Sequence, residues 1–214
     1  KPMQSVSPQY EAEEKITVNG NVDLYAVVFN RTTETDLTED QLPQVDIYKY
    51  KQVIFVGDSR TEFMENVLTG MGESATKNVK FVCSAGKGLD WFTTTGWAQL
   101  YSIVQHDSNS ILSKKTAVIF NFGVNDLSKS ADYAEYYNWI APQLKSKGCE
   151  LYFMSVNPVN RLMLPNAGRA DRSEAAVRSF NQYMKANLSS AYTYIDMYSY
   201  LKSTGYSFAS DKYG

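Results

Sequence analysis

The chain has 214 residues, of which 43% are hydrophobic and 21% are charged, and its formal net charge is −2. These values are typical of a globular protein with one principal domain and a sizeable core, and they exclude electrostatic capture of nucleic acid or an anionic membrane. No apolar run approaches the roughly 20 residues that cross a bilayer, so we expect no membrane span. No residue spacing suggests a metal or cofactor site. Cys83 and Cys149 each border a predicted strand, which favours two buried thiols over a disulfide.

Residues 1–46 differ in character from the rest of the chain. The segment "KITVNGNVDLYAVVF" predicts a short β-hairpin around an Asn-Gly turn, and the polar "NRTTETDLTEDQLPQVD" predicts a linker. A single hairpin is marginally stable, so this piece either packs on the main domain or is the tail of an upstream module. "VDLYAVVF" resembles the final strand of the Listeria–Bacteroides surface repeats. We therefore expect an N-terminal β appendage at 1–46 and a main domain at 47–214.

Five apolar runs in the main domain predict β-strands, and helical patterns separate them. The runs lie at 52–57, 79–84, 116–123, 150–156 and 192–197. Near-continuous apolar strands are covered on both faces, and strands that alternate with helices form a parallel sheet between helix layers. The sequence therefore predicts an α/β fold with a five-stranded parallel sheet.

Two of the intervening helices carry a clear apolar face at helical spacing. The faces consist of Tyr133, Tyr136, Tyr137, Ile140 and Leu144 in one helix, and Val177, Phe180, Met184 and Leu188 in the other. Ser173 precedes the second helix and is the expected N-cap. We interpret both faces as hydrophobic core rather than as a cofactor site.

Three predicted strands end in polar or glycine-rich residues, at the edge of a parallel sheet where ligands gather. The segments are "GDSR" (57–60), "SAGKG" (84–88) and "GVND" (123–126). Each segment has a purely structural alternative. Ser59 could cap the next helix, Gly86 and Gly88 could serve only a tight turn, and Asn125 could form an Asx-turn.

Taken together, these strand ends suggest acyl transfer. A serine at the start of a helix has a backbone N–H without a helical partner, and this N–H can face a developing oxyanion. A glycine after the neighbouring strand allows a second backbone N–H to approach the same point, and the Asn125 side chain can donate a third hydrogen bond. Preorganised donors of this kind stabilise the transition state by a few kcal/mol each.

The order and placement of the three segments resemble the SGNH (GDSL) hydrolase family over about residues 50–210, and "SVNPVN" (155–160) is similar to members from Gram-positive gut bacteria. The resemblance implies a flavodoxin-like three-layer α/β/α sandwich. It also implies that Ser59 is the nucleophile and that its N–H, the Gly88 N–H and the Asn125 side chain form the oxyanion hole. Gly86 competes with Gly88 for the second position.

The catalytic base is the point at which the chain departs from the family pattern. A serine hydroxyl needs a base, which the family supplies from an Asp-x-x-His block after the last strand. The only histidine, His106, precedes the third strand, so that strand of roughly 25 Å separates it from the site. Either the chain is cut just before the block, which we favour, or Asp211 is the family aspartate and Gly214 stands in place of the histidine.

Two functional hypotheses follow. The first is a secreted or cell-surface serine esterase that removes acyl groups, acetyl among them, from carbohydrate. The second is a non-catalytic carbohydrate- or ligand-binding module on the same fold. Trp91, which follows the glycines, and Asn157, after the fourth strand, are candidate substrate-binding residues, whereas Phe92 and Trp97 fit a helix core equally well. We expect a monomer without a nucleic-acid partner.

Overall fold

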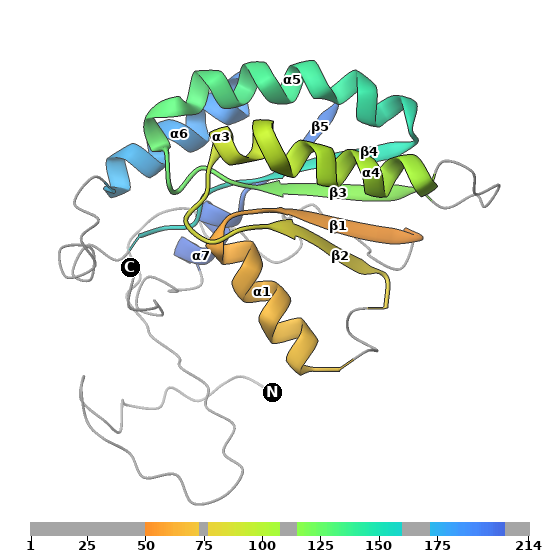
Figure 1. Cartoon of the computed structure of the whole chain (residues 1–214). Helices are drawn as coiled ribbons and strands as arrows, with labels where there is room; N and C mark the ends of the chain where they lie inside the picture. Colours follow the sequence, from red (N-terminus) through yellow and green to blue (C-terminus); the bar gives the residue numbers. More distant parts are fainter. Residues whose placement is uncertain (1–49, 73–76, 108–114, 160–171, 204–214) are drawn as a thin grey trace, which may run out of the picture.

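The computed structural model describes residues 50–72, 77–107, 115–159 and 172–203 (Figure 1). The predicted appendage at 1–46 and the residue Asp211 lie outside these ranges. The division of the chain into an appendage and a main domain therefore stays a prediction.

Five strands form one parallel sheet in the order β2-β1-β3-β4-β5. They are β1 (Gln52–Gly57), β2 (Val79–Cys83), β3 (Thr116–Asn121), β4 (Cys149–Met154) and β5 (Tyr192–Ile195). In the register of the sheet, Gly57 at the end of β1 lies beside Cys83 of β2 on one side and Asn121 of β3 on the other. The first three strands therefore end side by side, as the sequence predicts.

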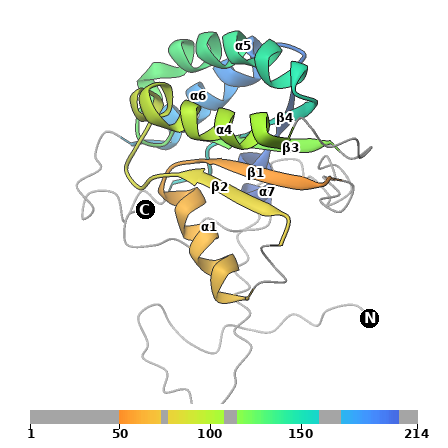
Figure 2. The ribbon, with the colours of Figure 1, turned by 45° about the vertical axis from the view of Figure 1, so that its right-hand side comes forward.

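Helices cover both faces of this sheet (Figures 1 and 2). The elements are α1 (Ser59–Gly70), α3 (Leu89–Trp91), a π-helical turn (Phe92–Gly96), α4 (Trp97–Asp107), a 3₁₀ turn (Leu127–Lys129), α5 (Ser130–Ser146), α6 (Glu174–Asn187) and α7 (Met197–Ser203). Helices α4, α5 and α6 lie on one face, whereas α1 and α7 lie on the other. The expected three-layer α/β/α, flavodoxin-like fold is confirmed.

The core on the α4–α6 face is rich in aromatic side chains. Tyr133 and Tyr137 of α5 are fully buried, and Phe180 of α6 packs edge-on against Tyr133 with ring centroids 5.5 Å apart. The predicted apolar faces of α5 and α6 are thus confirmed as core. Ser173 is the N-cap of α6, since its side chain accepts a hydrogen bond from the Ala176 N–H at 3.1 Å.

The third strand ends two residues earlier than predicted. β3 stops at Asn121, and Gly123 has a φ of +127°, which removes it from strand geometry. The ring of Phe180 occupies the space beside Gly123, because a Cβ atom there would lie 2.5 Å from two ring atoms. The boundary is therefore set by α6, far along the chain.

The last two strands are also shorter than predicted, β4 because of a tertiary contact and β5 because of a local one. β4 stops at Met154, because the Asn181 side chain of α6 binds both the N–H and the C=O of Val156, at 2.8 and 2.9 Å. β5 stops at Ile195, because Asp196 accepts a hydrogen bond from the Ser199 N–H at 3.1 Å at the start of α7.

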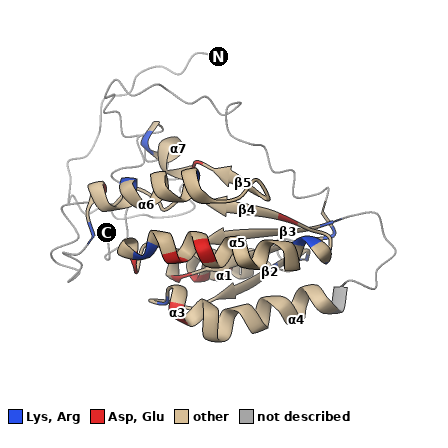
Figure 3. Cartoon of the chain, turned by 90° about the horizontal axis from the view of Figure 1, so that it is seen from above, with Lys and Arg blue, Asp and Glu red and all other residues tan. Residues whose placement is uncertain are grey.

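Both cysteines are thiols rather than halves of a disulfide. Cys149 is buried as predicted, but Cys83 is only half-buried, because it lies on the edge strand β2. In the described part of the chain, Lys and Arg residues are interspersed with Asp and Glu (Figure 3). None of the described helices combines the length and apolar character needed to cross a bilayer.

Candidate active site

The turn from β1 into α1 requires a glycine at position 57. A Cβ atom at Gly57 would lie 2.0 Å from Oγ1 of Thr61 and 2.8 Å from the carbonyl oxygen of Asn121. The absence of a side chain thus allows the first turn of α1 to pack against the ends of β1 and β3. Ser59, the first residue of α1, is exposed at this edge of the sheet.

Asp58, rather than Ser59, caps α1, so the structural alternative for Ser59 is wrong. The Asp58 side chain accepts a hydrogen bond from the Arg60 N–H at 3.1 Å. Asp58 is fully buried and pairs with the Arg60 guanidinium through both carboxylate oxygens, each at 2.9 Å. Arg60 also donates to the Asn121 carbonyl at 2.9 Å, which joins the start of α1 to the end of β3.

The loop after β2 is fastened to the same edge by two hydrogen bonds. The Ser84 N–H donates to the Gly57 carbonyl at 3.3 Å, and the Ala85 N–H donates to the Glu62 carboxylate of α1 at 2.6 Å. Gly86 has a φ of +70° with no atom near its Cβ position, so it meets a conformational need of the turn. The loop therefore lies next to the first turn of α1.

Gly88 has a different role, because it lies against the carboxylate of Asp126. The Asp126 side chain accepts hydrogen bonds from the Leu89 N–H at 2.9 Å and from the Tyr133 hydroxyl at 2.7 Å. Burial raises the pKa of Asp126, and the two donors and nearby Lys129 offset only part of that effect. Asp126 thus ties the end of the loop after β2 (residues 84–88, hereafter the glycine loop) to the segment that follows β3.

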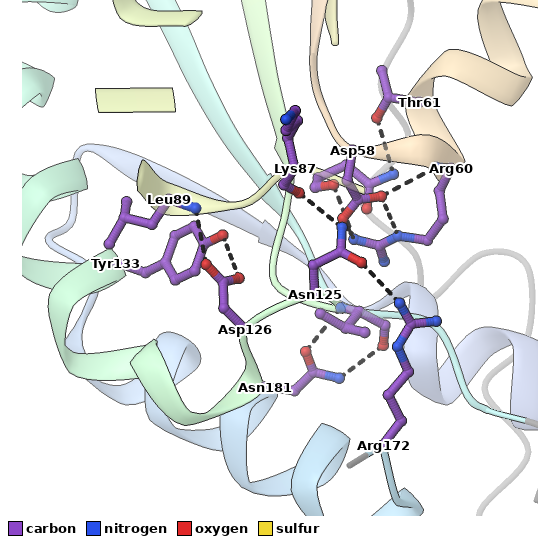
Figure 4. Close-up of polar contacts among 12 residues, drawn as sticks. Asp58, Arg60, Thr61, Lys87, Leu89, Asn125, Asp126, Tyr133, Arg172 and Asn181 are labelled. Atoms are coloured by element: carbon purple, nitrogen blue, oxygen red, sulfur yellow. Dashed lines mark hydrogen bonds and ion pairs between the residues drawn. The ribbon is translucent and has the colours of Figure 1, made fainter. Parts of the chain in front are cut away.

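Asn125 connects the glycine loop to the start of α6 (Figure 4). Its Nδ2 donates to the Lys87 carbonyl at 2.7 Å, and its Oδ1 accepts from Nη2 of Arg172 at 2.8 Å. The Asx-turn alternative is wrong, because these contacts lie outside its own turn. Asn125 therefore stands at the same edge as Ser59 and beside the Gly88 loop. The convergence of all three oxyanion donors on one point stays a prediction.

The two predicted substrate-binding residues differ in their surroundings. Trp91 is half-buried and packs on the core, with its ring centroid 6.1 Å from that of Phe122. Asn157 follows β4, and its Oδ1 is buried without a hydrogen-bond partner among the described residues. Phe92 is fully buried and Trp97 packs against Tyr101, which supports their interpretation as core.

His106 lies away from this group of residues. It belongs to the last turn of α4, which runs from the glycine loop toward the opposite edge of the sheet, where β3 begins (Figure 1). The rejection of His106 as the base of Ser59 is consistent with this placement. Asp211, the other candidate, lies outside the described residues.

Three contributors to the site were missed by sequence reasoning: Glu62, Asp126 and Arg172. Asp126 stands inside the "GVND" segment, so its position next to Asn125 was a usable signal. Glu62 is three residues after Ser59 and therefore on the same side of α1, and this spacing was a weaker sequence signal. Arg172 had no signal, because it is 47 positions from its partner Asn125.

Comparison with known proteins adds no argument about the fold or the function of the chain. No family model matches the chain, and no curated protein is similar to it in sequence. Among solved structures, the chain is similar to one described as "Crystal Structure of TesA", with 16% identity and a TM-score of 0.37. That match covers 63% of this chain and 71% of the TesA chain. The fold assignment rests instead on the strand order and layers described above.

Proposed function

We propose that residues 47–214 form a serine ester hydrolase domain of the SGNH type, with Ser59 as the nucleophile. The observation that carries this proposal is the position of Asn125. Its amide is hydrogen-bonded to the glycine loop at 2.7 Å, and that loop is bonded in turn to Gly57 at the end of β1, two residues before Ser59. A serine at a helix start, a glycine loop and an amide donor thus share one edge of the sheet.

The proposed reaction proceeds through an acyl-enzyme. Ser59 Oγ attacks the acyl carbon while a base takes its proton, and the backbone N–H of Ser59, that of Gly88 and Nδ2 of Asn125 bind the resulting oxyanion. The tetrahedral intermediate expels the alcohol, which receives the proton from the base. Water then hydrolyses the acyl-serine. The family resemblance supplies the base from an Asp-x-x-His block, with Asp211 as a candidate for its aspartate.

The proposed substrate is a small acyl ester or an acylated carbohydrate, in a secreted or cell-surface setting and with a monomeric enzyme. Asn157 is the better supported of the two substrate-binding candidates, because its buried Oδ1 has no partner among the described residues. Trp91 is the weaker, because its ring packs on the core.

The second candidate function is a binding module on the same fold without catalysis. The position of His106 favours it, because the chain contains one histidine and that histidine lies in the last turn of α4. In this case the oxyanion donors would bind a carbonyl or carboxylate group of a ligand without turnover.

Two measurements on purified protein separate these functions. Hydrolysis of p-nitrophenyl acetate and of an acetylated xylo-oligosaccharide is followed for the 214-residue chain and for a version extended through an Asp-x-x-His block. We expect little turnover by the 214 residues and Ser59-dependent turnover by the extended version, which Ser59→Ala abolishes. Calorimetric binding of the acetylated sugar without turnover in either version would establish the binding module instead. Turnover that survives Ser59→Ala would refute the assignment of the nucleophile.

A further inference from the structure

The side-chain amide of Asn125 is held at both ends by groups of opposite hydrogen-bonding character (Figure 4). The Lys87 carbonyl can only accept a hydrogen bond, and the Arg172 guanidinium can only donate one. The contacts are 2.7 Å from Nδ2 to the Lys87 oxygen and 2.8 Å from Nη2 of Arg172 to Oδ1. Because the two ends of an amide have nearly the same shape, these partners decide which end faces the glycine loop.

This orientation determines what Asn125 can offer to a ligand. Nδ2 carries two hydrogens, and the Lys87 carbonyl takes one of them. A flipped amide would present Oδ1 toward the glycine loop, and that oxygen would repel a developing oxyanion. Arg172 keeps Oδ1 on its own side, and its positive charge polarises the amide so that the N–H groups become stronger donors.

The backbone around Arg172 is fixed by the start of α6. The next residue, Ser173, is the N-cap of that helix and holds the Ala176 N–H through its side chain at 3.1 Å. Helix α6 is anchored in turn by Phe180 and Met184, which lie in the core. The guanidinium is therefore presented to Asn125 from the residue directly before the N-cap of an anchored helix.

We propose that Arg172 is a positioning residue for the oxyanion hole: it fixes and polarises the Asn125 amide without itself contacting the substrate. This role rests on the proposed function, because it has a catalytic meaning only if Asn125 binds an oxyanion. It assigns a task to a residue that lies outside all three strand-end segments.

The first test is spectroscopic and does not depend on activity. The Asn125 side-chain N–H signals of ¹⁵N-labelled protein are assigned through their loss in Asn125→Ala. We expect Arg172→Met to shift these signals and to accelerate rotation about the amide bond. Arg178→Met is the matched control, because Arg178 is an exposed arginine of α6, the helix that begins two residues after Arg172. Unchanged Asn125 signals in Arg172→Met would overturn the proposal.

The second test is kinetic and uses the active, extended version of the chain. We expect Arg172→Met to lower kcat about tenfold with little change in KM, less than the loss of a whole donor, and Arg172→Lys to restore part of the rate. In an Asn125→Ala background, Arg172→Met should have no further effect on kcat, because the two residues act as one unit.

Equal losses of kcat in both backgrounds would show that Arg172 acts independently of Asn125, and the proposal would be wrong. If the extended version lacks Ser59-dependent hydrolysis, the proposed function fails and the catalytic role of Arg172 fails with it. The spectroscopic test still reports in that case whether Arg172 holds the amide, so the two failures are distinguishable.

Discussion

Gly88 lies so close to Asp126 that a Cβ atom at position 88 would be 2.3 Å from Oδ2 of the carboxylate. The same oxygen accepts the Leu89 N–H at 2.9 Å. The glycine therefore allows the backbone of the loop to rest directly on a half-buried carboxylate.

Gly88→Ala is expected to lower the free energy of unfolding by about 1–3 kcal/mol, the usual cost of overpacking a well-packed site. The methyl group must displace Asp126 from its two hydrogen bonds. Chemical denaturation measures the effect. Gly70→Ala is the control, since no atom lies within 4 Å of its Cβ position. Adding Asp126→Ala should make the Gly88→Ala change nearly neutral, and an undiminished cost in that background would contradict the explanation.

In a version extended through an Asp-x-x-His block that has first been shown to have Ser59-dependent turnover, Asn125→Ala is expected to lower kcat by ~10²–10³ with little change in KM, because the donor acts mainly in the transition state. Kinetics and melting temperature are measured on the same preparation. Asn138→Ala is the matched control, because Asn138 also bridges two segments, through the Asn187 carbonyl at 2.9 Å and the Ser189 N–H at 2.8 Å. A near-normal kcat with lowered stability in Asn125→Ala would leave this residue a purely structural role.

Asp126 is expected to make stability depend on pH in the direction opposite to that of a paired surface carboxylate. Burial raises its folded-state pKa above the ordinary value of 3.8, so the folded state binds the proton more tightly than the unfolded state. The stabilisation from this proton is complete below pH 3.8 and is lost as the pH rises through the folded-state pKa. The difference in unfolding free energy between the natural chain and Asp126→Asn, measured by urea denaturation from pH 3 to 7, should fall with pH. A difference that grows with pH would mean that the pKa is lowered.

Cys83 is expected to react slowly with alkylating reagents although it is only half-buried. Two main causes raise the pKa of its thiol to about 12. The larger is burial, and the smaller is the hydrogen bond that the thiol donates to the Glu65 carboxylate at 3.2 Å. Since the thiolate is the reactive form, iodoacetamide labelling should be more than about tenfold slower at pH 8 than for an ordinary cysteine and should still accelerate above pH 10. Mass spectrometry locates the label. Glu65→Gln should speed the reaction, whereas Glu135→Gln, at an exposed position of α5, should not. A labelling rate that reaches its plateau near pH 8.5 would disprove the raised pKa of Cys83.

The sequence predicted the fold well because the sheet consists of apolar runs and the helices carry regular apolar faces. The ends of β3 and β4 were predicted less well, because distant residues determine them. Phe180 ends β3 beside Gly123, and Asn181 removes Val156 from β4. Neither contact leaves a trace in the local pattern of the strand concerned.

The candidate site shows the same division between local and distant information. Asn125 could be identified from the sequence because it lies shortly after a predicted strand. Its partner Arg172 could not be identified, because helical and strand periodicity do not reveal which residue an arginine side chain contacts. The interpretation of Ser59 as the N-cap of α1 was wrong for a local reason. Serine and aspartate are equally good N-caps, and the contact that distinguishes them here is the buried pair of Asp58 with Arg60.

The position of β1 between β2 and β3 in the sheet has a consequence for how the chain folds. Gln52 of β1 pairs with Thr116 of β3, 64 positions later. During synthesis, at about 5–20 residues per second, the β3 side of β1 stays unpaired for roughly 3–13 s. Non-local pairings of this kind form late. The edge that carries both Ser59 and Asn125 is therefore completed only when β3 docks. Substitutions along the β1–β3 seam should consequently show themselves first as aggregation of newly made chains, before any defect appears in molecules that have folded.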